Sequence, residues 1–272
     1  MNIIKILIQG IVLVALFLGT WLGLQRIDWT HKMHLDKASD KTEEKLGDVF
    51  WDAYKNYEQL VSRPAILRPV DTMVNVICAA NKIDRKTIKL HILESEEVNA
   101  FALPNGHLVV YTGLLRAADR PEEVCGVLGH EIAHIQLHHV MKKLVKEVGL
   151  SALVAMTTGR GGGELARQTA KTLSSSAFDR SLEKEADIKS ADYMVEAGID
   201  PVALADFLYK LSAEEGPGGE YLSWISTHPD SKERGEYLVE YCKGKEVETK
   251  PVIAAETWKK LKEKVKGEEA ED

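Results

Sequence analysis

Cysteine is scarce in this sequence, which has only Cys78, Cys125 and Cys242 among its 272 residues. No two of them have the C-x-x-C spacing, so the sequence predicts neither a disulfide framework nor a cysteine-rich zinc site. Basic residues do not outnumber acidic ones, because the formal net charge at pH 7 is −7. This balance argues against nucleic acid as a partner. The hydrophobic content of 44% is ordinary for a globular protein with a sizeable core.

Only the N-terminus has an apolar run long enough to cross the hydrocarbon core of a membrane. From Ile6 to Leu24, Gln9 and Thr20 alone interrupt a run of apolar residues and glycine. We therefore interpret residues 1–25 as a membrane anchor. The alternative is a cleaved signal peptide, but the run is long for one and no clear A-x-A-like cleavage site follows it. Basic residues lie on both sides of the run, so the positive-inside rule does not decide its orientation.

The segment after the apolar run alternates between helical and strand patterns. Apolar spacing predicts amphipathic helices over about Lys41–Val61 and Val70–Asn81. Alternation with period two over Ile88–Leu93, followed by Asn99–Leu103 and His107–Tyr111, predicts three strands with a Pro-Asn-Gly turn before the last one. We expect a small antiparallel sheet. Such a sheet either pairs with an extended substrate or has a purely structural role.

An H-E-x-x-H motif follows the predicted sheet, at His130–His134. On a helix, two histidines four residues apart lie one turn apart on the same face. Both imidazoles can then hold one Zn²⁺ while the intervening glutamate acts as a general base. The sequence favours a helix here, because Asp119 can cap it, Pro121 fits its first turn and Glu122 completes a capping-box-like start.

The second half of the sequence is mostly helical in pattern. Val145–Thr158 is apolar but too short to span a membrane, so it predicts a buried or interfacial helix. Gly159–Gly163 is glycine-rich and lacks the Lys-Ser/Thr ending of a phosphate loop, which leaves a mobile loop over a cleft or a connector. Helical patterns resume over Leu165–Ala197, and Gly216–Gly219 predicts another loop. Lys259–Asp272 is almost all charged, and we expect it to fray into solvent.

A catalytic zinc site needs a third protein ligand, and His138 is the first candidate. It lies eight residues after His130, which is roughly 12 Å along a straight helix. Three histidines so spaced cannot converge on one ion. Glu183 and Asp187 form a Glu-x-x-x-Asp pair on a predicted helix, so the first can bind zinc while the second holds a zinc-binding histidine. The alternative is a solvated acidic helix face.

Four blocks of the sequence together resemble the membrane-associated HtpX/BepA/CAAX-prenyl-protease group of zinc metallopeptidases, a gluzincin family. The blocks are Asn99–Gly106, His130–His139, Arg180–Asp187 with the pattern R-x-x-E-x-x-A-D, and His228-Pro229 with Arg234 in the pattern H-P-x-x-x-x-R. Two departures occur, because His138 stands where relatives often have arginine and Asp179 where they often have serine. Neither position is a proposed ligand.

The resemblance implies an α+β fold, namely a mostly helical zincin-type metalloprotease domain with a small antiparallel sheet beside the H-E-x-x-H helix. We expect this domain over residues 26–250, with its core at about 70–237. It follows the N-terminal transmembrane helix and precedes a charged C-terminal tail at 251–272.

The resemblance also implies a site in which His130, His134 and Glu183 bind one Zn²⁺ ion per chain and Glu131 is the general base. His228 would lie near the cleft, as a transition-state donor, a structural group or a fourth, regulatory ligand. The remaining implied residues, which would support the ligands, are Asp187 and Arg234.

The function implied is zinc-dependent endopeptidase cleavage of proteins or peptides. The substrates expected from the resemblance are misfolded or unassembled envelope proteins, cleaved by a periplasmic domain anchored in the bacterial inner membrane. A cleaved N-terminus would instead make the protein periplasmic or secreted. The alternative function is that of a membrane-tethered, chaperone-like binding protein with a structural or latent zinc site. The sequence does not predict an oligomeric state.

Overall fold

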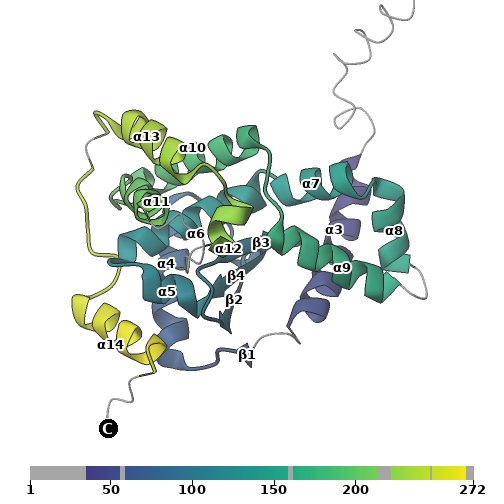
Figure 1. Cartoon of the computed structure of the whole chain (residues 1–272), viewed down its shortest axis with the longest axis horizontal. Helices are drawn as coiled ribbons and strands as arrows, with labels where there is room; N and C mark the ends of the chain where they lie inside the picture. The colour runs from purple at the N-terminus through teal and green to yellow at the C-terminus, as the bar shows by residue number, and fades with distance from the viewer. Residues whose placement is uncertain (1–34, 56–58, 159–161, 214–221, 246, 268–272) are drawn as a thin grey trace, which may run out of the picture. The chain divides into compact units, whose positions relative to one another are not determined.

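We describe the fold from a computed structural model of the chain (Figure 1). Residues 43–272 form one compact unit, which holds the sheet and nearly all of the helices described below. Among the described residues, no helix is both long and apolar enough to cross a membrane. The predicted anchor at residues 1–25 lies outside the described part. The structure describes residues 35–55, 59–158, 162–213, 222–245 and 247–267.

The chain is mostly helical, as predicted, and its helices cover a small sheet. The helices are α3 Leu35–Tyr54, α4 Pro64–Ala80, α5 Thr112–Ala117, α6 Pro121–Gln136, α7 His139–Glu147, α8 Leu150–Thr158, α9 Gly162–Ser175, α10 Arg180–Glu196, α11 Ala203–Ala213, α12 Leu222–Thr227, α13 Ser231–Cys242 and α14 Ala255–Val265, with a short 3-10 turn η1 at Arg85–Thr87.

The sheet is mixed, so the prediction of an antiparallel sheet is wrong. Its strands are β1 Gln59–Leu60, β2 Lys89–Glu94, β3 Ala100–Leu103 and β4 His107–Tyr111, in the order β1-β2-β4-β3. β3 and β4 form the expected antiparallel hairpin, but β4 pairs in parallel with β2. β3 lies at the edge of the sheet and pairs with β4 only. β4 therefore lies between β3 and β2, and it runs parallel to β2. Local periodicity cannot reveal this, because it does not say which strands become neighbours.

The turn between β3 and β4 depends on its Asn-Gly sequence. Asn105 and Gly106 both have positive φ, at 61° and 70°, which is the conformation that tight hairpin turns require. A Cβ on Gly106 would lie 1.8 Å from the carbonyl oxygen of Thr87. Glycine is therefore needed here both for the backbone conformation and for the close approach of the segment before β2.

Helix α6 occupies the core and packs against α10, α11 and β3 (Figure 1). Val124, Leu128 and Ile132 are fully buried along one face. The predicted cap is wrong by one residue. Arg120 is the N-cap, so that Glu123 rather than Glu122 reaches back, and its carboxylate accepts a hydrogen bond of 2.9 Å from the backbone N–H of Asp119.

Three predicted helical segments differ from those observed. The amphipathic helix predicted to reach Val61 ends at Tyr54, and the segment before Asn81 is helical from Pro64, a residue favoured at the first helical position. The helical patterns predicted over Leu165–Ala197 correspond to two helices with different bounds, α9 and α10, and Ser176–Asp179 lies between them. Gly149, with φ of 85°, separates α7 from α8.

The charged C-terminal segment does not fray over Ala255–Val265, so that expectation is wrong there. These residues form α14, which packs against α4 and α5 (Figure 1). Leu261 and Val265 are buried on its inner face. The Lys262 ammonium donates a hydrogen bond to the carbonyl of Ala118 at 2.6 Å, where α5 ends and its last carbonyls have no helical partner. Charge on the outer face therefore coexists with a packed inner face.

Candidate metal centre

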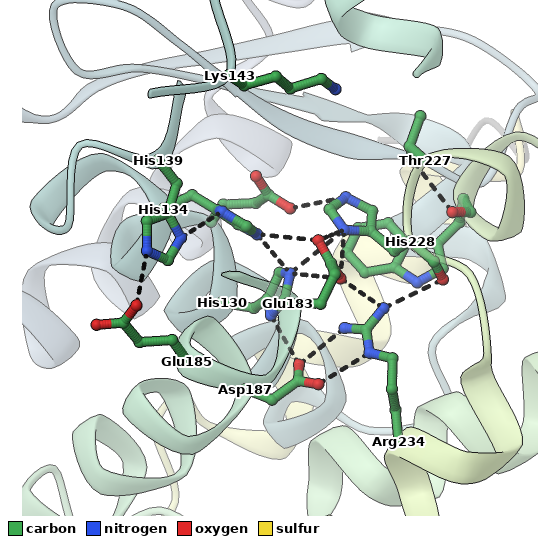
Figure 2. A network of polar contacts seen from close by, with 12 residues as sticks. His130, His134, His139, Lys143, Glu183, Glu185, Asp187, Thr227, His228 and Arg234 are labelled. Carbon is green, nitrogen blue, oxygen red and sulfur yellow. Dashed lines mark hydrogen bonds and ion pairs between the residues drawn. The ribbon is translucent and has the colours of Figure 1, made fainter. Parts of the chain in front are cut away.

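Four side chains from three parts of the chain converge on one point in the core (Figure 2). His130 and His134 come from α6, Glu183 from the start of α10, and His228 from the residue after α12. Each offers one ligand atom, and these atoms all lie within 4.8 Å of one another. The structure thus brings the three predicted ligands together and adds His228 to them.

The spacing of these atoms fits a single zinc ion. Bonds of about 2.0–2.1 Å to a tetrahedral ion place the ligand atoms roughly 3.3 Å apart. The Nε2 atoms of His130 and His134 are 3.0 Å apart, and Nδ1 of His228 lies 3.3 Å from Nε2 of His130. Glu183 completes the set, because its Oε1 is 3.4 Å from Nε2 of His134 and its Oε2 is 3.0 Å from Nδ1 of His228. Nitrogen and carboxylate ligands of this kind are those that zinc takes in proteins.

Close packing of α6 against α10 positions the carboxylates. A Cβ on Gly129 would lie 2.7 Å from Oγ of Ser190, so glycine allows the two helices to approach. The Ser190 hydroxyl also donates a hydrogen bond of 2.8 Å to the carbonyl of Gly126. Because Glu183 and Asp187 lie on the same face of α10 as Ser190, this contact directs both carboxylates at the histidines of α6.

The cluster is fully buried, and its electrostatics favour a cation. Burial lowers the pKa of His130 to about 3, which leaves this imidazole neutral and able to donate a lone pair. Burial alone would raise the pKa of Glu183, but its contacts with His228 and the charge of Arg234 hold it well below its usual range. A neutral imidazole at His130 and an ionised carboxylate at Glu183 are the protonation states that metal binding requires.

Glu131 lies beside the cluster and differs from Glu183 in its partners and in the direction of its pKa shift. Its side chain is fully buried, and neither carboxylate oxygen has a hydrogen-bond partner among the described residues. Nε2 of His228 is 3.4 Å from Oε1 of Glu131. Burial, together with the negative charge of Glu183, raises the pKa of Glu131 well above its ordinary range. A carboxylate with a raised pKa is a stronger base, which suits proton transfer near neutral pH.

Asp187 and Arg234 support the cluster from behind (Figure 2). Oδ1 of Asp187 is 2.8 Å from Nδ1 of His130. Arg234 donates to both carboxylate oxygens of Asp187 at 2.8 Å, and its Nη1 lies 2.8 Å from Oε2 of Glu183. The same Nη1 donates to the carbonyl of His228 at 3.1 Å. One guanidinium therefore ties α13 to α10 and to the loop that carries His228.

His138 lies outside the cluster, as predicted, but for a different reason. Helix α6 ends at Gln136, so the assumption of one straight helix is wrong. His138 has a left-handed conformation with φ of 54° and begins α7 in a new direction. Its side chain is 64% exposed, and its Nδ1 lies 3.5 Å from Oε2 of Glu43.

Sequence reasoning missed the residues that close over the cluster. The ring of Phe178 stacks on His134, with centroids 4.1 Å apart, and Trp224 stacks on His228 at the same distance. The buried ammonium of Lys143 lies 4.3 Å from the centre of the Phe178 ring and donates to the carbonyl of Ser176. No spacing in the sequence relates these residues to the motif. The only local signal is that Phe178 shortly precedes the Arg180 block.

Comparison with known proteins agrees with this geometry. The model of peptidase family M48 matches residues 68–241, a range that contains every residue of the cluster. The chain belongs to peptidase family M48. The resemblance predicted from four blocks is therefore confirmed, and membership of this family makes the chain a metallopeptidase, which is a hydrolase.

Three relatives illustrate the range of the family. Metalloprotease LoiP of Escherichia coli K12 is 32% identical over 173 residues, which cover 61% of this chain and 67% of LoiP. Mitochondrial metalloendopeptidase OMA1 of Bos taurus is 28% identical over 209 residues, 70% of this chain. The beta-barrel assembly-enhancing protease of Yersinia pestis is 26% identical over 199 residues, 68% of this chain. The match spans only 40% of each of these two longer M48 relatives.

Proposed function

We propose that the protein is a zinc-dependent metalloendopeptidase that cleaves peptide bonds in proteins. The observation that carries this proposal is the convergence of ligand atoms from His130, His134, Glu183 and His228 beside the buried carboxylate of Glu131. The first three residues would hold one Zn²⁺ ion per chain.

Zinc, when bound, would polarise the scissile carbonyl and lower the pKa of the attacking water. Glu131 acts as the general base: its carboxylate takes a proton from that water and returns it to the leaving amine. The environment of Glu131 supports this role, because its Oε1 lies 3.4 Å from Nε2 of His228 and neither of its oxygens has a hydrogen-bond partner among the described residues. Asp187 and Arg234 hold His130 and Glu183 in place.

His228 has two roles in this proposal, one in each state of the site. In the arrangement described, its Nδ1 lies among the zinc donors while its Nε2 faces Glu131. A catalytic zinc site needs one position open to water, so His228 must leave the donor set before turnover. Once withdrawn, it can donate a hydrogen bond to the oxyanion that develops on the substrate carbonyl.

Access to the cluster also requires movement. The side chains of Glu131 and His228 are 0% and 1% exposed, which no peptide can reach. Phe178 and Trp224 cover the histidine rings, so the substrate must displace at least one of them.

For the physiological role, we propose proteolysis of misfolded or unassembled envelope proteins at the bacterial inner membrane. The apolar run at residues 1–25 would anchor a periplasmic catalytic domain. Cleavage of that run would give a periplasmic or secreted protein. Support comes from the run itself and from a relative named a beta-barrel assembly-enhancing protease. Membrane fractionation of the expressed full chain tests the anchor, because extraction by carbonate would exclude a spanning segment.

A second candidate function is a chaperone-like binding protein with a structural zinc ion. One observation favours it: with His228 included, the protein supplies all four donors, as structural zinc sites usually do. Degradation of casein by the full chain in detergent separates the two functions. We expect cleavage that a zinc chelator abolishes and that added Zn²⁺ restores. Binding of casein without cleavage by the zinc-loaded protein would favour the second function instead.

A further inference from the structure

His139 is a fully buried histidine outside the donor set that faces a proposed zinc ligand (Figure 2). Its Nδ1 lies 3.1 Å from Nδ1 of His134, and the two ring centroids are 5.1 Å apart. Its other nitrogen, Nε2, lies 3.3 Å from Oε2 of Glu185. Glu185 stands at the surface, with a side chain that is 53% exposed. The three residues form a line from the cluster to solvent.

The break between α6 and α7 creates this contact. In one continuous helix, residues five positions apart point in directions roughly 140° apart, because each residue turns the helix by about 100°. His134 and His139 would then face different sides. The left-handed conformation of His138 turns the chain, and α7 starts at His139 with its ring directed back at His134. The contact therefore depends on the tertiary fold and not on sequence spacing.

The protons along this line allow one arrangement only. Nε2 of His134 faces the other donors, so a zinc-binding His134 uses this nitrogen and carries its proton on Nδ1. Nδ1 of His139 must then accept that proton in a hydrogen bond, which places the proton of His139 on Nε2. Nε2 of His139 in turn donates to the carboxylate of Glu185.

We propose that His139 and Glu185 are positioning residues that orient and polarise His134 as a zinc ligand. This inference rests on the proposed function, since it requires that His134 binds zinc. Histidine ligands usually donate their second N–H to a carboxylate or carbonyl, which fixes the ring and raises its basicity. The carboxylate of Asp187 lies beside His130 in this way, with Oδ1 2.8 Å from Nδ1. His134 has the same kind of support through the imidazole of His139, and the carboxylate at the end of this line is that of Glu185, at the surface.

The test is the affinity of the full chain for Zn²⁺, measured by competition with a chelating dye. His139→Leu removes the acceptor for the His134 N–H, and we expect its affinity to fall about 10- to 100-fold, the usual effect of losing such a partner. His139→Asn keeps an oxygen near the position of Nδ1 and should recover part of the affinity. Glu185→Gln should weaken binding less than His139→Leu does. His138→Asn, at the exposed neighbour, is the matched control and should bind zinc as wild type does.

Thermal unfolding of the metal-free variants shows which of them fold. If His139→Leu does not fold, the His139→Asn and Glu185→Gln variants still decide the test. If the folded variants bind zinc with unchanged affinity while His134→Ala abolishes binding, the positioning role of His139 and Glu185 is overturned and the proposed function is not. If the wild-type protein binds no zinc, or binds it independently of His134, the proposed function is overturned, and with it the positioning role of His139 and Glu185.

Discussion

Arg234 gives the most quantitative prediction, because its guanidinium contacts both Glu183 and Asp187. It is 3% exposed, and its three nitrogens contact Asp187, Glu183 and the carbonyl of His228. Arg234→Met preserves the bulk of the side chain but removes its charge and all of these hydrogen bonds. Two buried carboxylates then lose the guanidinium that contacts both of them.

The expected cost follows from this loss. Removing one partner of a buried ion pair destabilises a protein by about 3–5 kcal/mol, because the remaining charge is left uncompensated. For a domain of 150–250 residues, each kcal/mol lowers the melting temperature by about 2–4 °C. We therefore expect Arg234→Met to lower the melting temperature of the metal-free protein by about 6–20 °C. Zinc should reduce this loss, since the ion itself would compensate Glu183.

The assay is thermal unfolding of the full chain in detergent, with and without Zn²⁺. Arg234→Lys keeps the charge but not the two-pronged contact with Asp187, so its loss should be intermediate. Arg180→Met is the matched control. Arg180 is 77% exposed and pairs with Asp230 at 2.9 Å, and such surface pairs contribute about 0–1 kcal/mol. A loss of less than about 1 kcal/mol for Arg234→Met would refute the electrostatic reasoning.

Three further predictions concern other parts of the molecule. Asp187→Asn should weaken zinc binding about 10- to 100-fold in dye competition, and unchanged affinity would contradict the support assigned to it. Phe178→Ala should raise the kcat/KM for casein, because the ring that covers His134 is removed, and reduced cleavage with zinc retained would contradict a covering role. His91 and His107 contact each other at 2.9 Å, and burial lowers the pKa of each to about 4. Between pH 6.5 and 4 the unfolded chain, with histidine pKa near 6.5, binds more protons than the folded chain does. The free energy of unfolding should therefore decrease as the pH is lowered through this window, by at most about 1.4 kcal/mol per pH unit for each histidine. His91→Phe should make the dependence shallower, and an unchanged slope would contradict this.

Local spacing predicted the parts of the site that depend on one helix each. His130 and His134 lie four residues apart and therefore share a face of α6, and the same holds for Glu183 and Asp187 on α10. The chemistry of zinc then required that the two helices meet, because one H-E-x-x-H pair leaves the ion a ligand short. The packing that brings them together, at Gly129 and Ser190, was not visible in the sequence.

The features that sequence reasoning missed depend on contacts between distant residues or on a single backbone angle. The parallel pairing of β2 with β4 is set by the position of β3 and not by any strand pattern. The positive φ of His138 ends one helix and starts another, which moves His139 from an unremarked position to the side of His134. The burial of Leu261 in α14 was hidden by the charged residues around it.

The central claim is that Glu131 performs the chemistry at a zinc site built by other residues. Glu131→Gln in the full chain tests it most directly, with zinc content and casein cleavage measured on the same preparation. We predict one zinc ion per chain in both proteins and a loss of cleavage of at least about 100-fold in the variant, because general-base catalysis contributes about 10²–10⁴-fold. Cleavage at the wild-type rate by a zinc-loaded Glu131→Gln protein would contradict it.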